Sequence, residues 1–564
     1  MTLTLSVIGV GYLGAVHAAA MAELGHHVLG LDIDAERIAA LQAGHAPFHE
    51  PGFEEILERG LASGRLRFTT DYADLAHADV HFLGLGTPQR ADGFGADLSH
   101  LEAATDALAE VLPARDGAPT LVVGKSTVPA GTARMLAARL EQVEGVRLLW
   151  NPEFLREGFA VQDTLEPDRL VYGVAETGAP RAEQAVAMLD AVYAQILARQ
   201  TPRLVMNYEA AELVKVSANA FLATKISFIN AVSEMCEVAG ADVTDVARAI
   251  GMDDRIGAKF LRAGVGFGGG CLPKDIRAFL ASAEAYGVGE ALGFLREVDA
   301  VNERRRSRVL SLAGEMLGDL TGRRITVLGA TFKPNSDDVR DSPALDVAAR
   351  LYAAGAQVTV TDPEGLRNAA RQLGETVAYE QETQSALRGA ELTVLLTEWD
   401  EYRDLDPAQA AALVAAPRML DGRNVLDPSR WRGAGWEIRS LGRGETAGGA
   451  GRENAAPSVP AGAASATVPA GGASATGTEG PAGPSDLTGA AATAAVDRAA
   501  VAPAASAPAA VAPVAVAPAA VAPVAVAPAA SAPAAVDPAA SAPAGRSVPG
   551  SMTSSGGMEH AAAI

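Results

Sequence analysis

A strand, a glycine-rich turn and a helix at the N-terminus constrain the fold of this chain more than any other feature. Residues 3–9 form an apolar run, and Gly9-Val10-Gly11-Tyr12-Leu13-Gly14 follows directly. A helix rich in small residues comes next, and a second apolar run over 26–34 includes Asp32. A G-x-G-x-x-G motif alone is weak, but here it links a strand to a helix, with an acidic residue about 20 residues on. This context predicts a dinucleotide-binding turn in a parallel α/β sheet.

The glycines and the acidic residue each have a physical role in such a turn. Gly9 makes the turn, Gly11 lets a pyrophosphate approach the backbone, and Gly14 packs the helix against the strand. Asp32 would bind both ribose hydroxyls and repel a 2′-phosphate, so we predict NAD rather than NADP. Arg37 is expected to stack on the adenine or contact the ribose, the alternative being a solvated helix residue. The predicted NAD-binding residues of this unit are Gly9, Val10, Gly11, Tyr12, Leu13, Gly14, Asp32 and Arg37.

Three further predicted strands end in polar residues. They lie within residues 79–89, 120–132 and 146–158. Ligands of an open α/β sheet bind beyond the carboxyl ends of its strands, so we expect these ends to line a binding site. The polar residues at these ends include Thr87, Lys125, Ser126, Thr127, Glu153 and Glu157.

Glu153 and Glu157 are four residues apart in the last of these segments. On a helix they would share a face, where like charges repel unless a ligand or a lysine lies between them. The turn is flanked by Trp150, Phe154 and Leu155, which favours a functional site over the alternative of a solvated acidic turn.

A long apolar helix is predicted over residues 207–240. Lys215 and Asn219 are four residues apart and share one face of it, among Val, Ala and Phe residues. A lysine in such surroundings is costly unless it faces a site, the alternative being a side chain that reaches solvent at the helix edge. We expect Cys236 to lie in the core, and the helix to form a domain junction and a homodimer interface.

Four of the six residues before Cys271 are glycines, whose backbone amides can approach a bound group. Pro273 suits the first turn of a helix, which would place Cys271 at a helix N-terminus. There the helix dipole and Lys274 would favour the thiolate over a thiol whose ordinary pKa is about 8.5. Cys271 is therefore a candidate nucleophile, and a small buried hydrophobe in a loop is the alternative.

A second α/β unit begins near residue 322, without a G-x-G-x-x-G motif. Its first strand leads into a polar loop with Lys333 and Arg340, which would clamp a diphosphate if they face the site, the alternative being solvent-facing loop residues. Before this unit, a helix is predicted over 285–318. We interpret its basic run, residues 304–306, as a solvated face.

Composition excludes several classes of protein. The chain has 564 residues but only two cysteines, which rules out a disulfide framework and suits a reducing cytoplasm. A formal charge of −22 argues against nucleic-acid binding. The sequence has no membrane-helix run and no signal peptide at its N-terminus, so we predict a cytoplasmic protein without a membrane contact. We expect no bound metal.

From about residue 446 the chain is dominated by Ala, Pro, Gly, Ser and Thr, with no Phe, Trp or Tyr. Such a segment cannot bury enough apolar surface to offset its ordering entropy, so we predict a disordered tail whose partner is unknown. The predicted fold class is α/β, with two Rossmann-like α/β domains joined by a long central helix and a disordered Ala/Pro-rich C-terminal tail. The predicted domains are an NAD-binding domain (1–200), a central helical segment (201–305), a C-terminal α/β domain (306–440) and the tail (441–564).

Nine sequence blocks, in order over roughly residues 1–440, resemble the UDP-glucose/GDP-mannose dehydrogenase family. Several independent blocks together are far more specific than one motif. One departure is Gly270, where family members often have serine, and we expect a looser loop with little effect on the chemistry. The blocks are GVGYLG (9–14), GTP (86–88), KSTVPAGT (125–132), NPEFLREG (151–158), ELVKVSANAF (212–221), RIGAKFL (255–261), GVGFGGGCLPKD (264–275), FKPNSDDVRDSP (332–343) and DGRN (421–424).

The resemblance implies that a nucleotide sugar is oxidised twice at C6, with two NAD consumed. It favours UDP-glucose as substrate and UDP-glucuronate as product, with GDP-mannose and UDP-N-acetylmannosamine as alternatives. Cys271 would attack the intermediate aldehyde, giving a thiohemiacetal that is oxidised to a thioester and then hydrolysed. Lys215 and Asn219 would stabilise negative charge on the C6 oxygen.

Further roles are implied by the same resemblance. Asp275 would order a water or act as base in the alcohol step, and Glu157 with Thr127 would position or activate the hydrolytic water. In the family, the residue matching Arg255 can reach across the dimer interface. The implied substrate-binding residues are Glu153, Phe154, Leu155, Lys215, Asn219, Arg255, Lys259, Phe260, Leu261, Gly268, Lys333 and Arg423. The implied further NAD contacts are Thr87, Thr127, Glu157, Lys274 and Arg340.

Two other classes of protein stay open at this point. In a two-electron dehydrogenase of the 6-phosphogluconate type, Cys271 would be structural and one NADH would form per substrate. A non-catalytic scaffold recruited through its tail is the second alternative. The presence of Cys271, Lys215, Asn219 and Asp275 argues against the scaffold.

Overall fold

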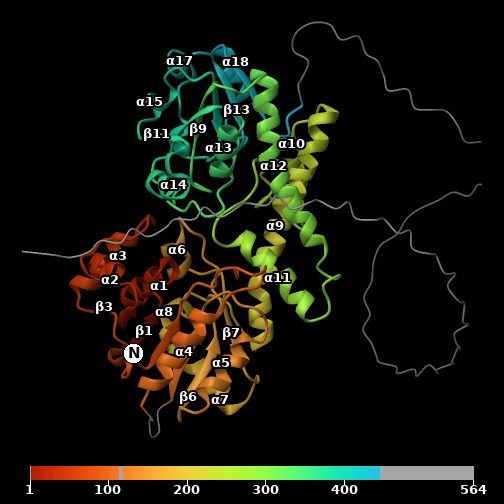
Figure 1. Ribbon diagram of the computed structural model, residues 1–564. Coiled ribbons are helices and arrows are strands. Elements are labelled where there is room, and N and C mark those ends of the chain that lie inside the picture. Colours follow the sequence, from red (N-terminus) through yellow and green to blue (C-terminus); the bar gives the residue numbers. More distant parts are fainter. Residues whose placement is uncertain (1, 114–118, 445–564) are drawn as a thin grey trace, which may run out of the picture. The chain divides into compact units, whose positions relative to one another are not determined.

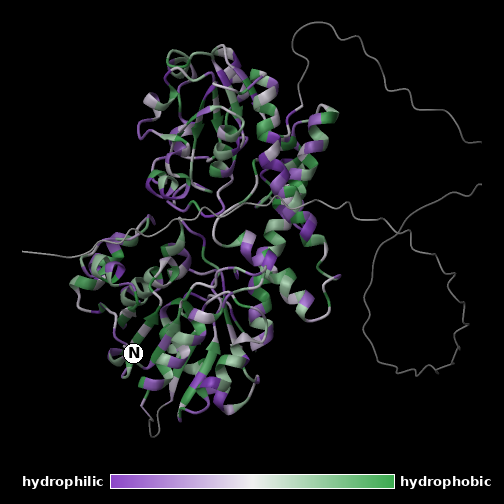
Figure 2. Ribbon diagram, viewed as in Figure 1, coloured by the Kyte–Doolittle hydropathy of each residue, from purple (hydrophilic) through white to green (hydrophobic). Residues whose placement is uncertain are grey.

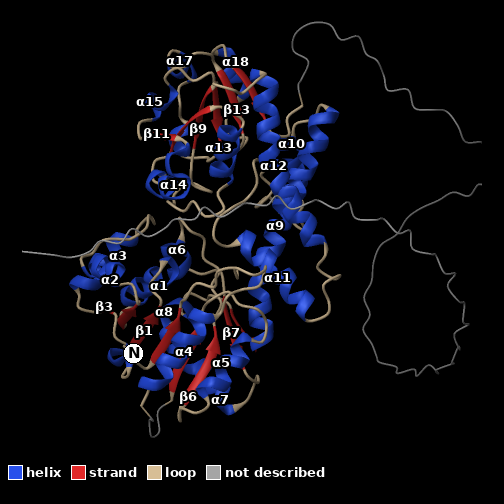
Figure 3. Ribbon diagram, in the orientation of Figure 1, coloured by secondary structure: helices blue, strands red, loops and turns tan. Residues whose placement is uncertain are grey.

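The computed structural model describes residues 2–113 and 119–444, which contain two sheets with helices packed on them (Figure 1, Figure 3). The first sheet has the order β3-β2-β1-β4-β5-β6-β7-β8 and the second the order β11-β10-β9-β12-β13-β14. Neighbouring strands are parallel, except that β6 and β7 pair antiparallel. The predicted α/β class with two Rossmann-like units is confirmed. The predicted tail lies, from residue 445 on, outside the described residues.

The first sheet occupies residues 4–207. Its strands are β1 (Thr4–Ile8), β2 (His27–Leu31), β3 (Leu66–Thr69), β4 (Val80–Leu83), β5 (Thr120–Gly124), β6 (Val146–Trp150), β7 (Leu170–Val174) and β8 (Arg203–Asn207). Its helices are α1 (Tyr12–Glu23), α2 (Ala35–Gln42), α3 (Phe53–Ala62), α4 (Ser99–Val111), α5 (Thr132–Leu140), α6 (Ala160–Leu165), α7 (Pro180–Val192) and α8 (Ala194–Leu197), with a 3₁₀ turn at Tyr72–Leu75. The inner strands β4 and β5 are fully buried because helices cover both faces of a parallel sheet.

The second sheet occupies residues 324–440. Its strands are β9 (Arg324–Leu328), β10 (Gln357–Thr361), β11 (Ala378–Tyr379), β12 (Leu392–Leu395), β13 (Arg418–Asp421) and β14 (Glu437–Ser440). Its helices are α13 (Pro343–Ala353), α14 (Leu366–Leu373), α15 (Thr383–Leu387), α16 (Asp400–Arg403), α17 (Pro407–Ala411) and α18 (Pro428–Gly433), with a 3₁₀ turn at Gly374–Thr376. Figure 2 shows apolar strands inside each sheet. In the second sheet, the strands over 324–328 and 392–395 contribute apolar side chains to the hydrophobic core.

Four helices lie between the two sheets in the sequence. They are α9 (Tyr208–Ala239), α10 (Val243–Gly251), α11 (Leu272–Ala285) and α12 (Phe294–Leu317). α9 begins where the Asn207 side chain accepts a hydrogen bond from the Ala210 amide, and it ends at Gly240, whose φ is 74°. The predicted long helix and the buried Cys236 are both confirmed. None of the helices in the described residues is long and apolar enough to cross a membrane.

The basic run of α12 is not the solvated face that the sequence predicts, and the helix begins at Phe294 rather than at 285. Arg304 is half exposed, but the side chains of Arg305 and Arg306 are 0% and 5% exposed. Arg305 donates a hydrogen bond to the Gly264 carbonyl (3.2 Å) and faces two glutamates of α9. The prediction is wrong because all these partners lie far away in the sequence. The predicted domain boundaries stay predictions.

Candidate active site

Cys271 is the N-cap residue of α11, as the sequence predicts. The glycines before it pack where no side chain fits. A Cβ on Gly268 would lie 2.2 Å from the Asp341 carbonyl oxygen, and Gly269 has a φ of 86°. Asn302 of α12 pairs with both the amide and the carbonyl of Phe267, at 2.8 and 2.9 Å. This packing fixes the backbone that leads to the thiol.

Lys215, Asn219 and Asp275 lie together next to the glycine stretch, on α9 and α11. Asn219 donates a hydrogen bond to one carboxylate oxygen of Asp275 (2.7 Å), and Lys274 binds the other (2.5 Å). Lys215 forms an ion pair with Glu153 at 3.0 Å. The shared helix face of Lys215 and Asn219 thus points into the protein, not to solvent, since both residues are buried.

The charges around Lys215 keep it protonated. Burial lowers its pKa, but Glu153, through its charge and its hydrogen bond, and the charge of Asp275 act against this, and the pKa stays above its ordinary value. A charged amine held by a carboxylate is suited to stabilise an oxyanion.

The predicted thiolate of Cys271 does not form in the ligand-free protein. The side chain is open to solvent, yet protein atoms surround it closely enough that desolvation is the largest cause of a pKa raised to about 11. The charges of Glu153 and Glu157 raise the pKa further, and Lys215 opposes them. The helix dipole and Lys274 are therefore insufficient, and Cys271 is a thiol at neutral pH.

Glu157 lies on the loop after β6, not on a helix shared with Glu153. The two carboxylates have different partners, since Glu153 binds Lys215 and Glu157 binds Arg340 at 3.2 Å. Burial and then the charge of Asp338 raise the pKa of Glu157 to about 7, against the effect of Arg340. Its Oε2 atom is buried without a hydrogen-bond partner among the described residues. A carboxylate of this pKa can exchange a proton near neutral pH.

The glycine turn at the N-terminus of α1 fits a dinucleotide. The N-cap residue, Gly11, gives α1 no side-chain cap, and a Cβ there would meet nothing within 4 Å, which leaves free amides and open space for a pyrophosphate. A Cβ on Gly14 would lie 1.9 Å from the Gly9 carbonyl oxygen, so helix and turn need glycine for close packing. The side chain of Val10 is fully buried, which leaves only its backbone for a cofactor.

Asp32 directly follows β2, in the position expected for a ribose contact. The residue is 7% exposed and forms an ion pair with Arg37 at 2.9 Å. Arg37 also faces Asp34, the N-cap of α2, so the structure places the guanidinium beside the Asp32 carboxylate. This carboxylate would repel a 2′-phosphate.

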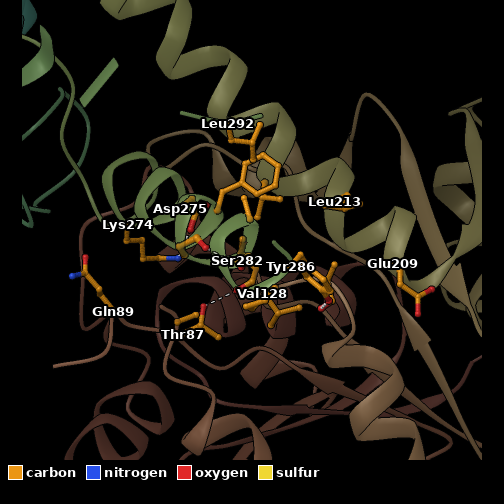
Figure 4. Close-up of a pocket in the computed structure, with 18 of the residues that line it drawn as sticks. Thr87, Gln89, Val128, Glu209, Leu213, Lys274, Asp275, Ser282, Tyr286 and Leu292 are labelled. Atoms are coloured by element: carbon orange, nitrogen blue, oxygen red, sulfur yellow. Dashed lines mark hydrogen bonds and ion pairs between the residues drawn. The ribbon is translucent and has the colours of Figure 1, made fainter. Parts of the chain in front are cut away.

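A cavity of about 350 Å³ lies beside the catalytic candidates (Figure 4). Its polar lining residues include Thr87, Thr127, Lys274 and Asp275, and the Thr87 hydroxyl donates to the Thr127 carbonyl (2.7 Å). The remaining lining comes largely from apolar side chains of α9, α11 and the loop before α5. The structure thus brings together residues predicted separately at two strand ends and at the start of α11.

The predicted substrate residues fall into two groups. Phe154 stacks on Arg169 with the guanidinium carbon 4.0 Å from its ring centroid, and Leu155 donates its amide to Glu153. Burial lowers the pKa of Lys333, although the charges of Glu157, Glu50 and Asp338 act against it. This first group lies at the site.

The second group is not assembled at the site. The Arg255 side chain is 90% exposed and paired with Asp253, and Lys259 and Phe260 are also exposed. Leu261 is buried in a small core with residues of α9 and α10. Arg423 donates to the carbonyls of Leu396, Gly266 and Phe332, so it braces the glycine stretch.

Sequence reasoning missed two acidic residues of this region. Asp338 binds Arg340 at 2.6 Å, and Glu50 contacts the loop after Glu157. Asp338 lies inside the block over residues 332–343, but its effect on the site depends on its ion pair with Arg340. The only local sign of Glu50 is an acidic residue before a proline and a helix start.

Three family models together match most of the described chain. They are the NAD binding domain (residues 3–197), the central domain (209–304) and the UDP binding domain (326–428) of the UDP-glucose/GDP-mannose dehydrogenase family.

Comparisons with individual proteins point to the same family. The chain is 40% identical over 449 residues to a UDP-glucose 6-dehydrogenase of Rhizobium meliloti, which covers 78% of this chain and 100% of the relative. A UDP-glucose dehydrogenase structure from Pyrobaculum islandicum has 39% identity and a TM-score of 0.69, covering 78% of this chain and 98% of its own. A UDP-D-ManNAc dehydrogenase structure from Pyrococcus horikoshii has 26% identity and a TM-score of 0.68, covering 79% and 100%. The resemblance read from the motifs is thus confirmed, and the chain belongs to the UDP-glucose/GDP-mannose dehydrogenase family as an NAD-dependent dehydrogenase.

Proposed function

We propose that this chain oxidises the C6 alcohol of UDP-glucose to a carboxylate, giving UDP-glucuronate, through a covalent intermediate on Cys271. The observation that carries the proposal is the convergence of a thiol at the start of α11 with Lys215, Asn219, Asp275 and Glu157 from three separate segments. A two-electron oxidation of an alcohol needs no nucleophile, whereas a four-electron oxidation gains from one.

In this proposal NAD, bound at the glycine turn and Asp32, supplies the hydride acceptor for both oxidations. Asp275 takes the hydroxyl proton of the alcohol, directly or through a water, because Asn219 and Lys274 hold its carboxylate in place. Lys215 stabilises the negative charge that develops on the C6 oxygen. The product of this first step is an aldehyde.

The sulfur of Cys271 then adds to the aldehyde carbon, and the thiol proton goes in net to the carbonyl oxygen, which gives a thiohemiacetal. Loss of hydride from that carbon and of the hydroxyl proton gives a thioester. Because the pKa of the free thiol is about 11, Lys215 has to offset the negative charges as the thiol ionises.

Hydrolysis completes the cycle. Glu157, whose pKa is about 7, takes a proton from a water that attacks the thioester carbon. The carbon–sulfur bond breaks, the sulfur regains a proton, and the uronic acid leaves. Thr127 helps to position this water. Lys333 and the glycine stretch hold the UDP part, and the UDP binding domain model supports this choice of nucleotide.

We further propose that the chain forms a homodimer through α9. Phe221, Phe228 and Met235 follow each other at intervals of seven residues and are 66%, 56% and 68% exposed. Residues at this spacing share one helix face, and large exposed apolar patches mark interaction sites. Arg255, the exposed arginine, would then reach the site of the second subunit. Phe228→Glu is expected to give a monomer in light scattering after gel filtration, and an unchanged dimer would contradict this interface.

The experiment that tests the activity is a count of NADH formed per UDP-glucose consumed, with the sugar product analysed. The wild type should give two NADH and UDP-glucuronate. Cys271→Ser should form no uronic acid. One NADH per sugar in the wild type, or full conversion by Cys271→Ser, would contradict the proposal and favour a two-electron dehydrogenase. Parallel assays with GDP-mannose and UDP-N-acetylmannosamine test the alternative substrates.

A further inference from the structure

Glu50 is a buried carboxylate that the reaction described above does not use. It lies in the turn before α3 and is 6% exposed. Its Oε1 accepts a hydrogen bond from the Ala160 amide (2.7 Å), and its Oε2 accepts from the Gly158 amide (2.6 Å) and from the Tyr12 hydroxyl. A buried carboxylate is costly unless it is fully hydrogen-bonded, and these three donors supply the bonds.

The three donors belong to two parts of the site. Tyr12 is the first residue of α1 and a member of the dinucleotide turn, whereas Gly158 directly follows Glu157. The backbone at Gly158 has a φ of 78° and passes so close to Asn335 that a Cβ would lie 2.9 Å from its carbonyl oxygen. The chain after Glu157 is therefore held between Glu50 on one side and Asn335 on the other.

The charge of Glu50 also reaches the site. It raises the pKa of Lys333, against the larger effect of burial. The pKa of Tyr12 is raised well above its ordinary range, first by burial, then by its hydrogen bond to Glu50 and by the charges of Glu50 and Glu157. The charges of Glu50 and Glu157 thus raise the pKa of both Tyr12 and Lys333.

We infer that Glu50 is a positioning residue, which fixes the loop that carries Glu157 against the dinucleotide turn and so sets the hydrolytic carboxylate for attack of water on the thioester. This inference rests on the proposed function and assigns a part of its last step. A residue that only capped the short helix α6 would change stability without changing which step limits turnover.

Glu50→Gln is the test. A glutamine side chain has only one acceptor oxygen, and its amide nitrogen would face a backbone amide that is itself a donor. The amide of Gly158 or of Ala160 then loses its hydrogen-bond acceptor, and the loop no longer holds Glu157 in a fixed position. We expect hydrolysis to slow roughly tenfold or more, since a lost buried hydrogen bond commonly has an effect of this size. The two hydride steps should change less, so the thioester accumulates on Cys271.

The measurement is intact-protein mass after acid quench of enzyme mixed with UDP-glucose and NAD, together with the NADH time course. Glu50→Gln should show a Cys271 adduct and a burst of two NADH per site before a slow phase. Tyr12→Phe removes the link to the dinucleotide turn and the 3.1 Å contact between the Gly158 amide and the Tyr12 hydroxyl, but it leaves both bonds from the loop amides to Glu50. It should therefore raise the KM for NAD without an adduct. Glu54→Gln is the matched control, because this exposed α3 glutamate accepts a hydrogen bond from the Ala46 amide (3.3 Å) and from no residue of the Glu157 loop.

Glu50→Asp covers the case in which Glu50→Gln does not fold, judged by circular dichroism. It keeps the charge and both oxygens but shortens their reach, so we expect a smaller build-up of adduct. If the folded variants slow all steps equally and carry no adduct, the inference about Glu50 is overturned while the two-NADH stoichiometry of the wild type still supports the proposed function. If the wild type itself yields one NADH per sugar, the proposed function fails first.

Discussion

The guanidinium of Arg340 lies against the backbone of Gly270, so closely that a Cβ on Gly270 would stand 2.3 Å from the Arg340 Cζ atom. The same guanidinium binds Glu157 at 3.2 Å and Asp338 at 2.6 Å. The absence of a side chain on Gly270 therefore leaves room for the contact between Arg340 and Glu157.

Gly270→Ser is expected to shift the pH dependence of turnover. The new Cβ pushes Arg340 away from Glu157, and because Arg340 lowers the pKa of Glu157, that pKa should rise above about 7. A general base works when it is deprotonated, so activity falls as the pH drops through its pKa, and the acid limb should move to higher pH. The pH profile of kcat measures this. Gly270→Ala is the control that adds the Cβ without the hydroxyl, and unchanged acid limbs in both variants would contradict the argument.

Glu157→Gln should remove the acid limb altogether. The amide cannot accept a proton from water, so hydrolysis should slow by roughly 10²- to 10⁴-fold while the oxidations proceed. A burst of two NADH per site, followed by a thioester on Cys271 detectable by mass, is the expected outcome. Glu166→Gln, at an exposed glutamate paired with Arg199, is a matched control. A Glu157→Gln enzyme with a normal steady rate would exclude Glu157 as the base.

Much of this arrangement follows from local sequence signals. The turn over 9–14 and the N-cap position of Cys271 each depend on residues a few positions apart, and the structure shows both. The structure also shows Asp32 directly after β2, and its contact with the ribose stays a prediction. The face shared by Lys215 and Asn219 likewise follows from helix geometry alone.

Properties that depend on distant partners could not be predicted. The pKa of Cys271 is raised by desolvation and then by the charges of Glu153 and Glu157, which the fold brings to it from more than a hundred residues away. The buried Arg305 is paired with carboxylates of α9. Glu50 becomes a candidate positioning residue only because the fold brings Tyr12 and Gly158 within hydrogen-bond distance of it. Local patterns predict which residues lie at a site, but not how charges from distant parts of the chain shift their pKa values.

The ligand-free enzyme should resist alkylation at Cys271. With a pKa of about 11, only about one thiol in ten thousand is ionised at pH 7, and the thiolate is the reactive form. The rate of modification by iodoacetamide should rise about tenfold for each pH unit up to about pH 10. Mass spectrometry of a Cys236→Ser protein isolates this site, because the second cysteine is then absent. Rapid alkylation with a midpoint near or below pH 8 would show that the thiolate is stabilised after all.

Asn302 should prove necessary both for the stability of the protein and for its turnover, because it supports the glycine stretch. Its side chain binds the amide and the carbonyl of Phe267, and a Cβ on Gly266 would lie 2.4 Å from its Oδ1 atom. Asn302→Ala leaves two buried backbone groups unpaired, so the free energy of unfolding should fall by about 2–4 kcal/mol in a denaturant titration. Turnover should fall at temperatures where the variant is still folded, because the backbone that presents Cys271 loses its support. Arg304→Ala, on the same helix but at a half-exposed position, is the control and should change the free energy of unfolding by less than about 1 kcal/mol. Equal losses in the two variants would mean that α12 as a whole, rather than this pair of hydrogen bonds, supports the stretch.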